Sequence, residues 1–156
     1  MKIYDCFMFF DETMMLEIRL NILNKFIDKF IITESKFSHN GKEKKLNFDI
    51  KKFSEFKSKI EYIIIDKQPK DILQEDADDS VVRKDEKKII NSLKRENFQR
   101  EMLSKGLVGL NQNDLIIISD VDEIPNLNNF KFEEVANKII IFKQKMFYYK
   151  LNLYYE

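Results

Sequence analysis

The sequence predicts an α/β fold in which a mostly parallel sheet is flanked by helices. Short runs of β-branched and aromatic residues alternate along the chain with longer segments whose apolar residues recur at helical spacing. The 156 residues, 44% of them hydrophobic, suffice for one core, so we expect a single domain over residues 1–156. In such sheets ligands bind beyond the carboxyl ends of the strands, which directs attention to the residues that follow each strand.

The first third of the chain predicts two strands and one helix. Residues 2–10 form an apolar and aromatic run, followed by Asp11 as the expected N-cap of a helix over 12–25. Leu16, Leu20, Leu23 and, just beyond its end, Ile27 recur at helical spacing. Residues 28–34 predict the second strand, and the polar segment 35–47 predicts a loop.

The middle of the chain predicts a short helix over residues 50–58, with Phe53 and Phe56 on one side, and a strand over 61–66. The acidic segment 67–80 is interpreted as a mobile loop. A calcium loop is the alternative, against which stands the absence of the glycine that such loops need for their turn.

A long helix is expected over residues 81–105, with Gly106 as its C-cap. Its expected apolar side consists of Ile89, Ile90, Leu93, Met102 and Leu103. Residues 114–119 are fully apolar up to Ser119 and predict a strand buried on both faces. A turn over 119–129 and two more strands over 138–142 and 144–155 complete the expected order.

Composition excludes several classes of protein. Equal numbers of basic and acidic residues, 27 each, argue against a general nucleic-acid binder, so no nucleic-acid partner is expected. No segment reaches the about 18–20 apolar residues that cross a bilayer, and the N-terminus does not fit a signal peptide, so a cytoplasmic protein is expected. The single cysteine, Cys6, excludes an intrachain disulfide and is interpreted as a small buried side chain rather than as a reactive thiol.

The strongest chemical feature is the segment from Ser119 to Pro125, which carries Asp120, Asp122 and Glu123 directly after the most hydrophobic strand. In extended geometry residues two apart share a face, so the two aspartates repel each other unless a cation lies between them. Carboxylate oxygens suit Mg²⁺ or Mn²⁺, which also bind substrate phosphates. A solvated acidic turn is the alternative interpretation.

Two further features carry weaker signals. Arg95 and Arg100 lie in the long helix and could bind a ligand phosphate, although Glu96 and Arg100 also suit an ordinary surface pair. His39, the only histidine, could be a ligand contact or a solvated loop residue. The chain has no GxxxxGK[ST] and no GxGxxG motif, which argues against a P-loop NTPase or a classical dinucleotide enzyme.

Taken together, these segments resemble the family 17 glycosyltransferases, the group that includes the β-1,4-mannosyl-glycoprotein 4-β-N-acetylglucosaminyltransferase. The matching segments, in order, are 4–10 with Glu12, 16–20, Glu34-Ser35 with Ser38-His39 and Gly41-Lys42, 45–48, Glu96 with Gln99-Arg100, and 119–125. The resemblance covers essentially the whole chain.

The resemblance implies a GT-A-like nucleotide-sugar fold and metal-dependent transfer of a sugar, N-acetylglucosamine, from a UDP-sugar. It implies Mn²⁺ or Mg²⁺ as cofactor, and a glycan or lipid-linked saccharide as acceptor. Asp122 would ligate the metal, and Asp120 would hold the ribose or a metal-bound water. The remaining candidates are Phe9, Phe10, Glu12 and Glu34 for the nucleoside, Arg100 for the diphosphate, His39 and Lys45 for the loop beside it, and Glu123 for the catalytic base.

Members of this family continue past the point where this sequence ends, so truncation on the acceptor side is expected. Two competing hypotheses follow. One is a catalytically incomplete nucleotide-sugar binding module that depends on a partner chain, which would bind the aromatic C-terminus (Phe147, Tyr148, Tyr149, Tyr154 and Tyr155). The other is a metal phosphohydrolase that uses the same acidic turn, although such enzymes of the haloacid type place paired aspartates after the first strand, where this chain has only Asp11 and Glu12.

Overall fold

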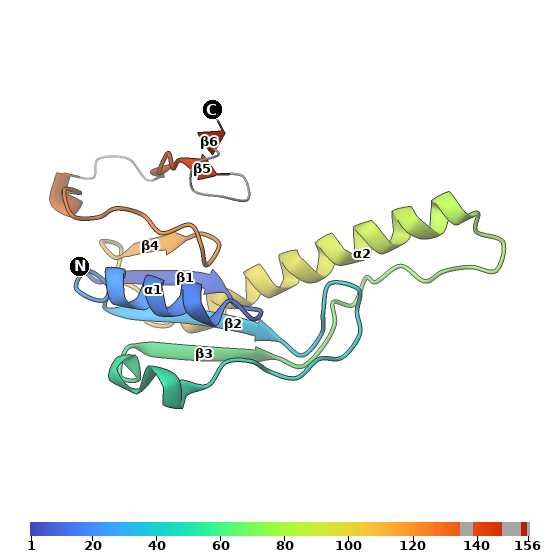
Figure 1. The fold of residues 1–156 in the computed structure, drawn as a ribbon, viewed down its shortest axis with the longest axis horizontal. Coiled ribbons are helices and arrows are strands. Elements are labelled where there is room, and N and C mark those ends of the chain that lie inside the picture. The colour runs from blue at the N-terminus through green and yellow to red at the C-terminus, as the bar shows by residue number, and fades with distance from the viewer. Residues whose placement is uncertain (135–138, 148–153, 156) are drawn as a thin grey trace. The chain divides into compact units, whose positions relative to one another are not determined.

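The computed structural model describes residues 1–134, 139–147 and 154–155, and the chain divides into two compact units, residues 1–122 and 123–156. The first unit contains a four-stranded, all-parallel sheet in the order β3-β2-β1-β4 (Figure 1). Its strands are β1 (Ile3–Met8), β2 (Lys29–Ser35), β3 (Ile60–Ile65) and β4 (Leu115–Ile118). The predicted α/β fold with a parallel sheet is confirmed. The single domain over residues 1–156 stays a prediction.

Helices cover both faces of this sheet. The strand register places Cys6 and Ile31 on the same face, where they pack with Leu103, which lies beyond the end of the long helix. Asp5 points to the other face, where Arg19 of helix α1 (Thr13–Leu23) binds it. Cys6 is fully buried, and burial raises the pKa of its thiol to about 12, in keeping with the interpretation of this residue as a small core side chain.

Helix α1 begins one residue later than expected. Glu12, rather than Asp11, holds the N-cap position, and its carboxylate accepts hydrogen bonds from the backbone N–H groups of Phe10 and Asp11. Leu16, Leu20 and Leu23 are buried as the spacing predicts. The N-cap prediction was wrong, since the helix begins one residue later and its N-cap residue makes no side-chain hydrogen bond to the first helical N–H groups.

The predicted helix over 50–58 is a 3₁₀ helix, η1 (Ile50–Phe56). Asp49 caps its start by accepting a hydrogen bond from the Lys51 backbone N–H at 3.0 Å. Phe53 and Phe56 are both buried, as expected, and the ring of Phe53 stacks on that of Phe48 with centroids 5.8 Å apart.

The long helix is divided into α2 (Val81–Glu101) and the short 3₁₀ helix η2 (Met102–Gly106). The predicted apolar side was wrong for its first part, since Ile89, Ile90 and Leu93 are exposed. Polar contacts to the segment 67–80 replace apolar packing there. They are Gln68–Arg95, Asp71–Lys94, Leu73–Asn91, Asp76–Lys87 and Asp79–Lys87.

These contacts run antiparallel to the helix, so segment 67–80 lies along it as an ordered strap, although it is irregular as expected. Lys87 and Asn91 are the buried residues of α2. The described residues contain no cluster of three or more acidic, histidine or cysteine side chains arranged to hold a metal ion, which leaves the calcium-loop alternative without support.

Gly106 is not the expected left-handed C-cap. The glycines with positive φ are Gly41 and Gly109. Gly106 is instead buried against β2, where a Cβ atom would lie 2.6 Å from Cγ2 of Ile31. The glycine therefore serves close packing of η2 on the sheet, which the position after a helical pattern could not reveal.

The predicted strand over 114–119 forms as β4, but it lies at the edge of the sheet. Ile116 and Ile118 are exposed, so the expectation of burial on both faces was wrong. A continuous run of hydrophobic residues predicts a strand covered on both faces. Among the strands that the structure describes, β4 pairs only with β1, so it is an edge strand and parts of it stay exposed.

The second unit contains η3 (Phe132–Glu134) and a two-stranded antiparallel sheet of β5 (Met146–Phe147) and β6 (Tyr154–Tyr155). The single strand expected over 144–155 was wrong, since its two ends pair with each other. Residues 139–142 form no strand, because no described strand pairs with them. The partner surface expected at the aromatic C-terminus lies outside the described part of the chain, which leaves out Tyr148, Tyr149 and the side chains of Phe147, Tyr154 and Tyr155. Residue 138 also lies outside it. No helix within the described ranges is long and apolar enough to cross a membrane.

Replacing Gly106 by alanine tests the close packing of η2. We expect Gly106→Ala to lower the free energy of unfolding by about 1–3 kcal/mol, because the added methyl group would overlap Ile31 in a packed core. Urea unfolding followed by circular dichroism measures this loss. The control Lys105→Ala, at an exposed position of the same helix, should stay within about 0.5 kcal/mol of the wild type. Equal stabilities of the two variants would contradict this packing.

Candidate functional site

The acidic turn defined by residues 119–122 follows β4 at the carboxyl end of the sheet. Val121 is buried, whereas Asp120 and Asp122 on either side of it are exposed. The turn thus anchors itself through an apolar side chain and presents both carboxylates to solvent. This is where the rule for parallel sheets places a ligand.

Arg19 fixes the backbone of this turn from within the core. Its guanidinium donates to the carbonyl oxygens of Asp120 (2.7 Å) and Val121 (3.3 Å) and to Oγ of Ser119 (2.7 Å). The same group makes a bidentate pair with Asp5 of β1, at 2.9 and 2.7 Å. One side chain therefore connects α1, β1 and the acidic turn.

The Arg19–Asp5 pair is fully buried, with 0% exposure of both side chains. Burial raises the pKa of the Asp5 carboxyl, and the hydrogen bonds and charge of Arg19 oppose that rise. The guanidinium also lies over the ring of Phe7, 4.6 Å from its centroid. Because every donor in this group has a nearby acceptor, the buried charges are compensated.

Arg100 at the end of α2 reaches the acidic turn from the opposite side of the sheet. Its Nη2 atom lies 3.2 Å from Oδ1 of Asp120 and 3.2 Å from Oε1 of Glu96. Arg100 thus makes the ordinary helical pair with Glu96, as one interpretation expected, and it also lies beside Asp120. Its role in binding a phosphate stays a prediction. No described hydrogen bond or ion pair involves the Asp122 side chain, so the two aspartates have different surroundings.

The end of β1 presents Phe10 and Glu12 but not Phe9. The ring of Phe9 is 1% exposed and packs edge-on against Phe48, with centroids 6.1 Å apart. Gln99 of α2 donates to the Thr33 carbonyl oxygen at 2.9 Å, which fixes the helix to the end of β2. In this structure Phe9 belongs to the core, and its role in lining a nucleoside pocket stays a prediction.

Glu34, near the carboxyl end of β2, is fully buried and accepts four hydrogen bonds. Its donors are Nζ of Lys44 (2.5 Å), the backbone N–H groups of Asn47 (2.8 Å) and Phe48 (3.0 Å), and the hydroxyl of Tyr62 (2.8 Å). Burial and this carboxylate raise the pKa of the Tyr62 hydroxyl. The carboxylate thereby ties the loop over 36–49 to the sheet.

That loop carries His39 to the same edge of the sheet as Phe10. The two rings lie 5.8 Å apart at 33°, and Nζ of Lys44 lies 4.8 Å from the centroid of the Phe10 ring. Arg95 of α2 donates to the His39 carbonyl oxygen at 3.0 Å. Gly41, at φ +83°, lets the guanidinium of Arg95 approach, because a Cβ atom there would overlap it. Lys45 is exposed, and it is Lys44 that faces the candidate site.

Glu123, the candidate base, is the first residue of the second unit and is exposed. Its part in chemistry stays a prediction.

The acidic turn fits a divalent cation only together with a ligand. The described residues hold no group of three or more acidic, histidine or cysteine side chains that could form a complete metal site. Mg²⁺ and similar ions are commonly bound by one or two carboxylates, with waters and substrate phosphates filling the remaining positions. Exposed Asp120 and Asp122 match that donor set.

The supporting roles of Arg19, Lys44, Arg95 and Gln99 were not predicted from the sequence: Arg95 was named only as a possible phosphate contact, and Gln99 only within a segment that matches the family. Arg19 carried a signal, since a positively charged residue within the apolar repeat of a helix needs a buried partner, and Asp5 interrupts the first strand. The other three are ordinary polar residues in polar segments. Only the tertiary structure distinguishes them from their neighbours.

Comparison with known proteins supplies one match. A family model described as Glycosyltransferase family 17 matches residues 1–155. No curated protein and no solved structure gives a significant match to this chain.

The buried pair predicts a specific pattern of stability. Arg19→Met should lower the free energy of unfolding by about 3–5 kcal/mol, because it leaves the Asp5 carboxylate buried without a partner. The double variant Asp5→Leu/Arg19→Met should recover much of that loss, since it removes both charges. Arg100→Met, at an exposed pair, should cost less than about 1 kcal/mol. Guanidinium chloride unfolding measures all three variants, and a small loss in Arg19→Met would contradict the role assigned to the pair.

Proposed function

Because the chain belongs to glycosyltransferase family 17, we propose that it transfers N-acetylglucosamine from UDP-N-acetylglucosamine to a glycan or lipid-linked saccharide, with the help of Mn²⁺ or Mg²⁺. The family implies sugar transfer; the donor, the acceptor class, the metal and a GT-A-like fold are the proposal. The observation that carries it is the acidic turn, whose backbone is held by a buried arginine while its two carboxylates stay exposed.

Asp122 is proposed as the direct metal ligand. It is exposed at the end of the sheet, and no described contact occupies its carboxylate. Asp120 already faces Arg100, so it is better suited to the ribose or to a metal-bound water. When bound, a divalent cation supplies positive charge against the diphosphate, which gains negative charge as it leaves the sugar.

The nucleotide is proposed to lie along the carboxyl edge of the sheet, from the acidic turn to the loop over 36–49. Arg100 would bind the diphosphate through its guanidinium. Phe10 and His39 provide ring surface for the base, with Glu12 beside them, whereas Glu34 and Phe9 support these residues from the core. Lys45 is retained as a loop residue near the nucleotide, and Glu123 as the candidate base that takes the proton of the acceptor hydroxyl.

Substitution of Asp122 tests the metal assignment. We expect Asp122→Asn to weaken Mn²⁺-dependent binding of UDP by more than about tenfold, since removing even an outer-shell partner of a metal commonly costs 10–100-fold. The fold should be retained, because the side chain is exposed. Calorimetric titration of UDP with Mn²⁺, and again with EDTA, measures the effect. Asp78→Asn, an exposed aspartate of the strap, is the matched control.

Unchanged UDP binding in a folded Asp122→Asn protein would rule out the metal assignment. If the wild-type protein binds UDP with metal but transfers no sugar to any glycan acceptor, the nucleotide-sugar binding module is the better description. If it cleaves phosphate esters without forming a glycosidic bond, the phosphohydrolase hypothesis is the better description.

Arg100→Ala tests contact with the diphosphate. The substitution should weaken the binding of UDP by about tenfold, because a hydrogen bond to a charged group is worth about 1.5–3 kcal/mol. The binding of uridine should be unaffected, because uridine carries no phosphate. Arg83→Ala, in an exposed ion pair near the start of α2, is the matched control. Equal losses for UDP and uridine would place Arg100 away from the phosphates. Calorimetry with both ligands gives the comparison.

A further inference from the structure

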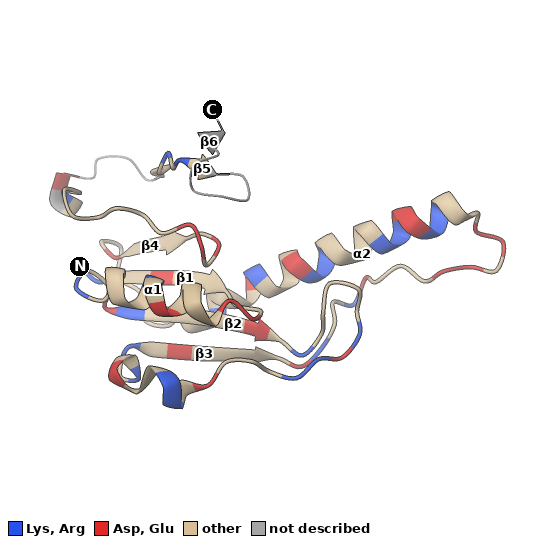
Figure 2. Ribbon diagram, viewed as in Figure 1, with Lys and Arg blue, Asp and Glu red and all other residues tan. Residues whose placement is uncertain are grey.

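The positive charge of this neutral chain is concentrated in one segment. Residues 36–70 contain ten lysines and five acidic residues, so the segment carries about +5 and the rest of the chain about −5. This segment comprises the loop after β2, η1, β3 and the turn that follows (Figures 1 and 2). A charge asymmetry of this kind is a property of the surface and is independent of the net charge.

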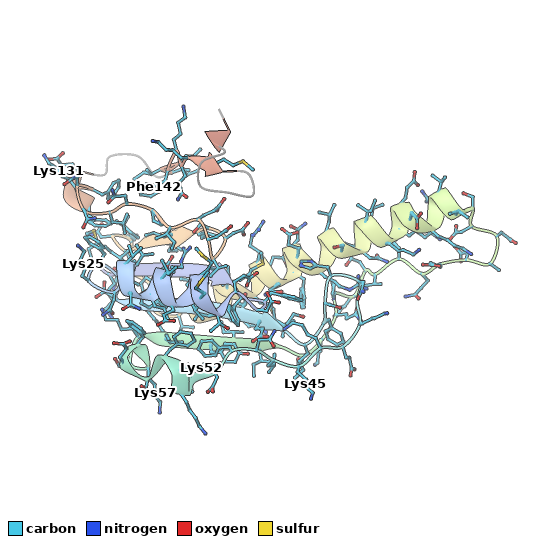
Figure 3. The ribbon with its side chains drawn as sticks, in the orientation of Figure 1. Lys25, Lys45, Lys52, Lys57, Lys131 and Phe142 are labelled. Carbon is cyan, nitrogen blue, oxygen red and sulfur yellow. The ribbon has the colours of Figure 1, made fainter. Side chains whose placement is uncertain are left out.

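Four of these lysines lie exposed along the β3 side of the first unit: Lys45, Lys51, Lys52 and Lys57, hereafter the lysine surface. Figure 3 shows Lys45, Lys52 and Lys57 on the same side of the sheet. No described ion pair involves any of the four, in contrast to Lys44 and Lys29, which are paired with Glu34 and Glu61. Their charges are therefore available to an external anion.

One lysine of this surface, Lys57, lines an apolar hollow of about 410 Å³. Its walls are formed by the aromatic pair Phe48 and Tyr62, whose ring centroids lie 4.4 Å apart, together with Ile50 and Ile60, and Asp49 and Lys57 complete the lining. On the same edge strand, Ile64 is 45% exposed. Cationic and apolar groups are thus combined on one face.

We propose that the lysine surface and its hollow dock this protein on the anionic face of a phospholipid bilayer. A bilayer is planar, so it meets this one face of the first unit and not the rest of that unit, which carries an excess of acidic residues. Lysines near an anionic leaflet each add to binding, and an apolar element supplies the second signal that stable attachment requires. Lys45 is the one lysine that this surface shares with the proposed nucleotide site, so docking is tested below on Lys51, Lys52 and Lys57, to which the proposed function assigns no role.

A bilayer accounts for these observations better than a nucleic acid does. Single-stranded nucleic acids stack their bases on open aromatic faces along a cationic groove. Here the two aromatic rings pack on each other, and the hydroxyl of Tyr62 is bonded to buried Glu34. The remaining hollow is apolar and suits the region of a lipid just below the phosphate.

Vesicle binding by the full chain tests the proposal. Co-sedimentation should detect binding to vesicles of phosphatidylcholine with 30 mol% phosphatidylserine, and binding should fall when NaCl is raised from 50 to 300 mM. The variant Lys51→Gln/Lys52→Gln/Lys57→Gln should bind about 100-fold more weakly, at about fivefold per lysine. The control Lys2→Gln/Lys88→Gln/Lys105→Gln removes the same charge from exposed lysines elsewhere and should bind like the wild type.

Four results would overturn the proposal. They are no binding to anionic vesicles, equal binding to vesicles of pure phosphatidylcholine, equal losses in the two triple variants, and displacement from anionic vesicles by a 20-nucleotide RNA at equal phosphate concentration. Circular dichroism establishes that both variants are folded, and if the first is not, the single variant Lys52→Glu replaces it. UDP titration with Mn²⁺ should be unchanged by Lys51→Gln/Lys52→Gln/Lys57→Gln, so failure of docking is distinguishable from failure of the proposed function.

Discussion

The geometry of the acidic turn depends on one buried guanidinium. Arg19 has no exposed surface, yet it satisfies Asp5, Ser119 and two backbone carbonyl oxygens of the turn at once. A buried charge is costly unless each of its donors finds an acceptor, so the turn cannot move away without leaving the arginine unsatisfied. The constraint acts on backbone atoms. It therefore holds the turn in place and leaves the carboxylates of Asp120 and Asp122 exposed.

Hydrogen bonds and ion pairs also fix the other loops at the carboxyl edge of the sheet. Glu34 accepts hydrogen bonds from four donors and so fixes the loop that carries His39. The strap over 67–80 is bound to α2 by ion pairs and by hydrogen bonds of the Asn91 side-chain amide. Hydrogen bonds require a defined geometry between donor and acceptor, whereas apolar packing tolerates small shifts. Fixing the edge in this way explains why Ile89 and Leu93 stay exposed although their spacing predicts a buried face. The face of α2 that meets the protein is the one bearing Lys87 and Asn91.

The sequence predicted the kind and order of the elements of the first unit because apolar periodicity reports which residues prefer burial. Apolar periodicity could not predict which helix or strand packs on which other element, and the wrong predictions for β4 and Gly106 have this cause. Hydrophobicity alone predicted that β4 is buried on both faces, and the position after a helical pattern predicted that Gly106 is a cap rather than a contact with Ile31. Among the site residues, Asp120 and Asp122 stand out locally because acidic residues follow an apolar strand. Arg19 lies 101 residues before Asp120, and such a pairing leaves no mark in a local pattern.

The two aspartates of the turn illustrate how a fixed backbone allows neighbouring carboxylates to differ. Asp120 lies 3.2 Å from Arg100, whereas the side chain of Asp122 has no described partner. Two adjacent anions with nothing between them repel each other, and the guanidinium beside Asp120 offsets part of that repulsion. The exposed carboxylate that has no described partner is the one suited to a hard cation. In the proposed transferase this division puts a cation beside Asp122 and a guanidinium beside Asp120, so that a leaving diphosphate between them would meet positive charge from both sides.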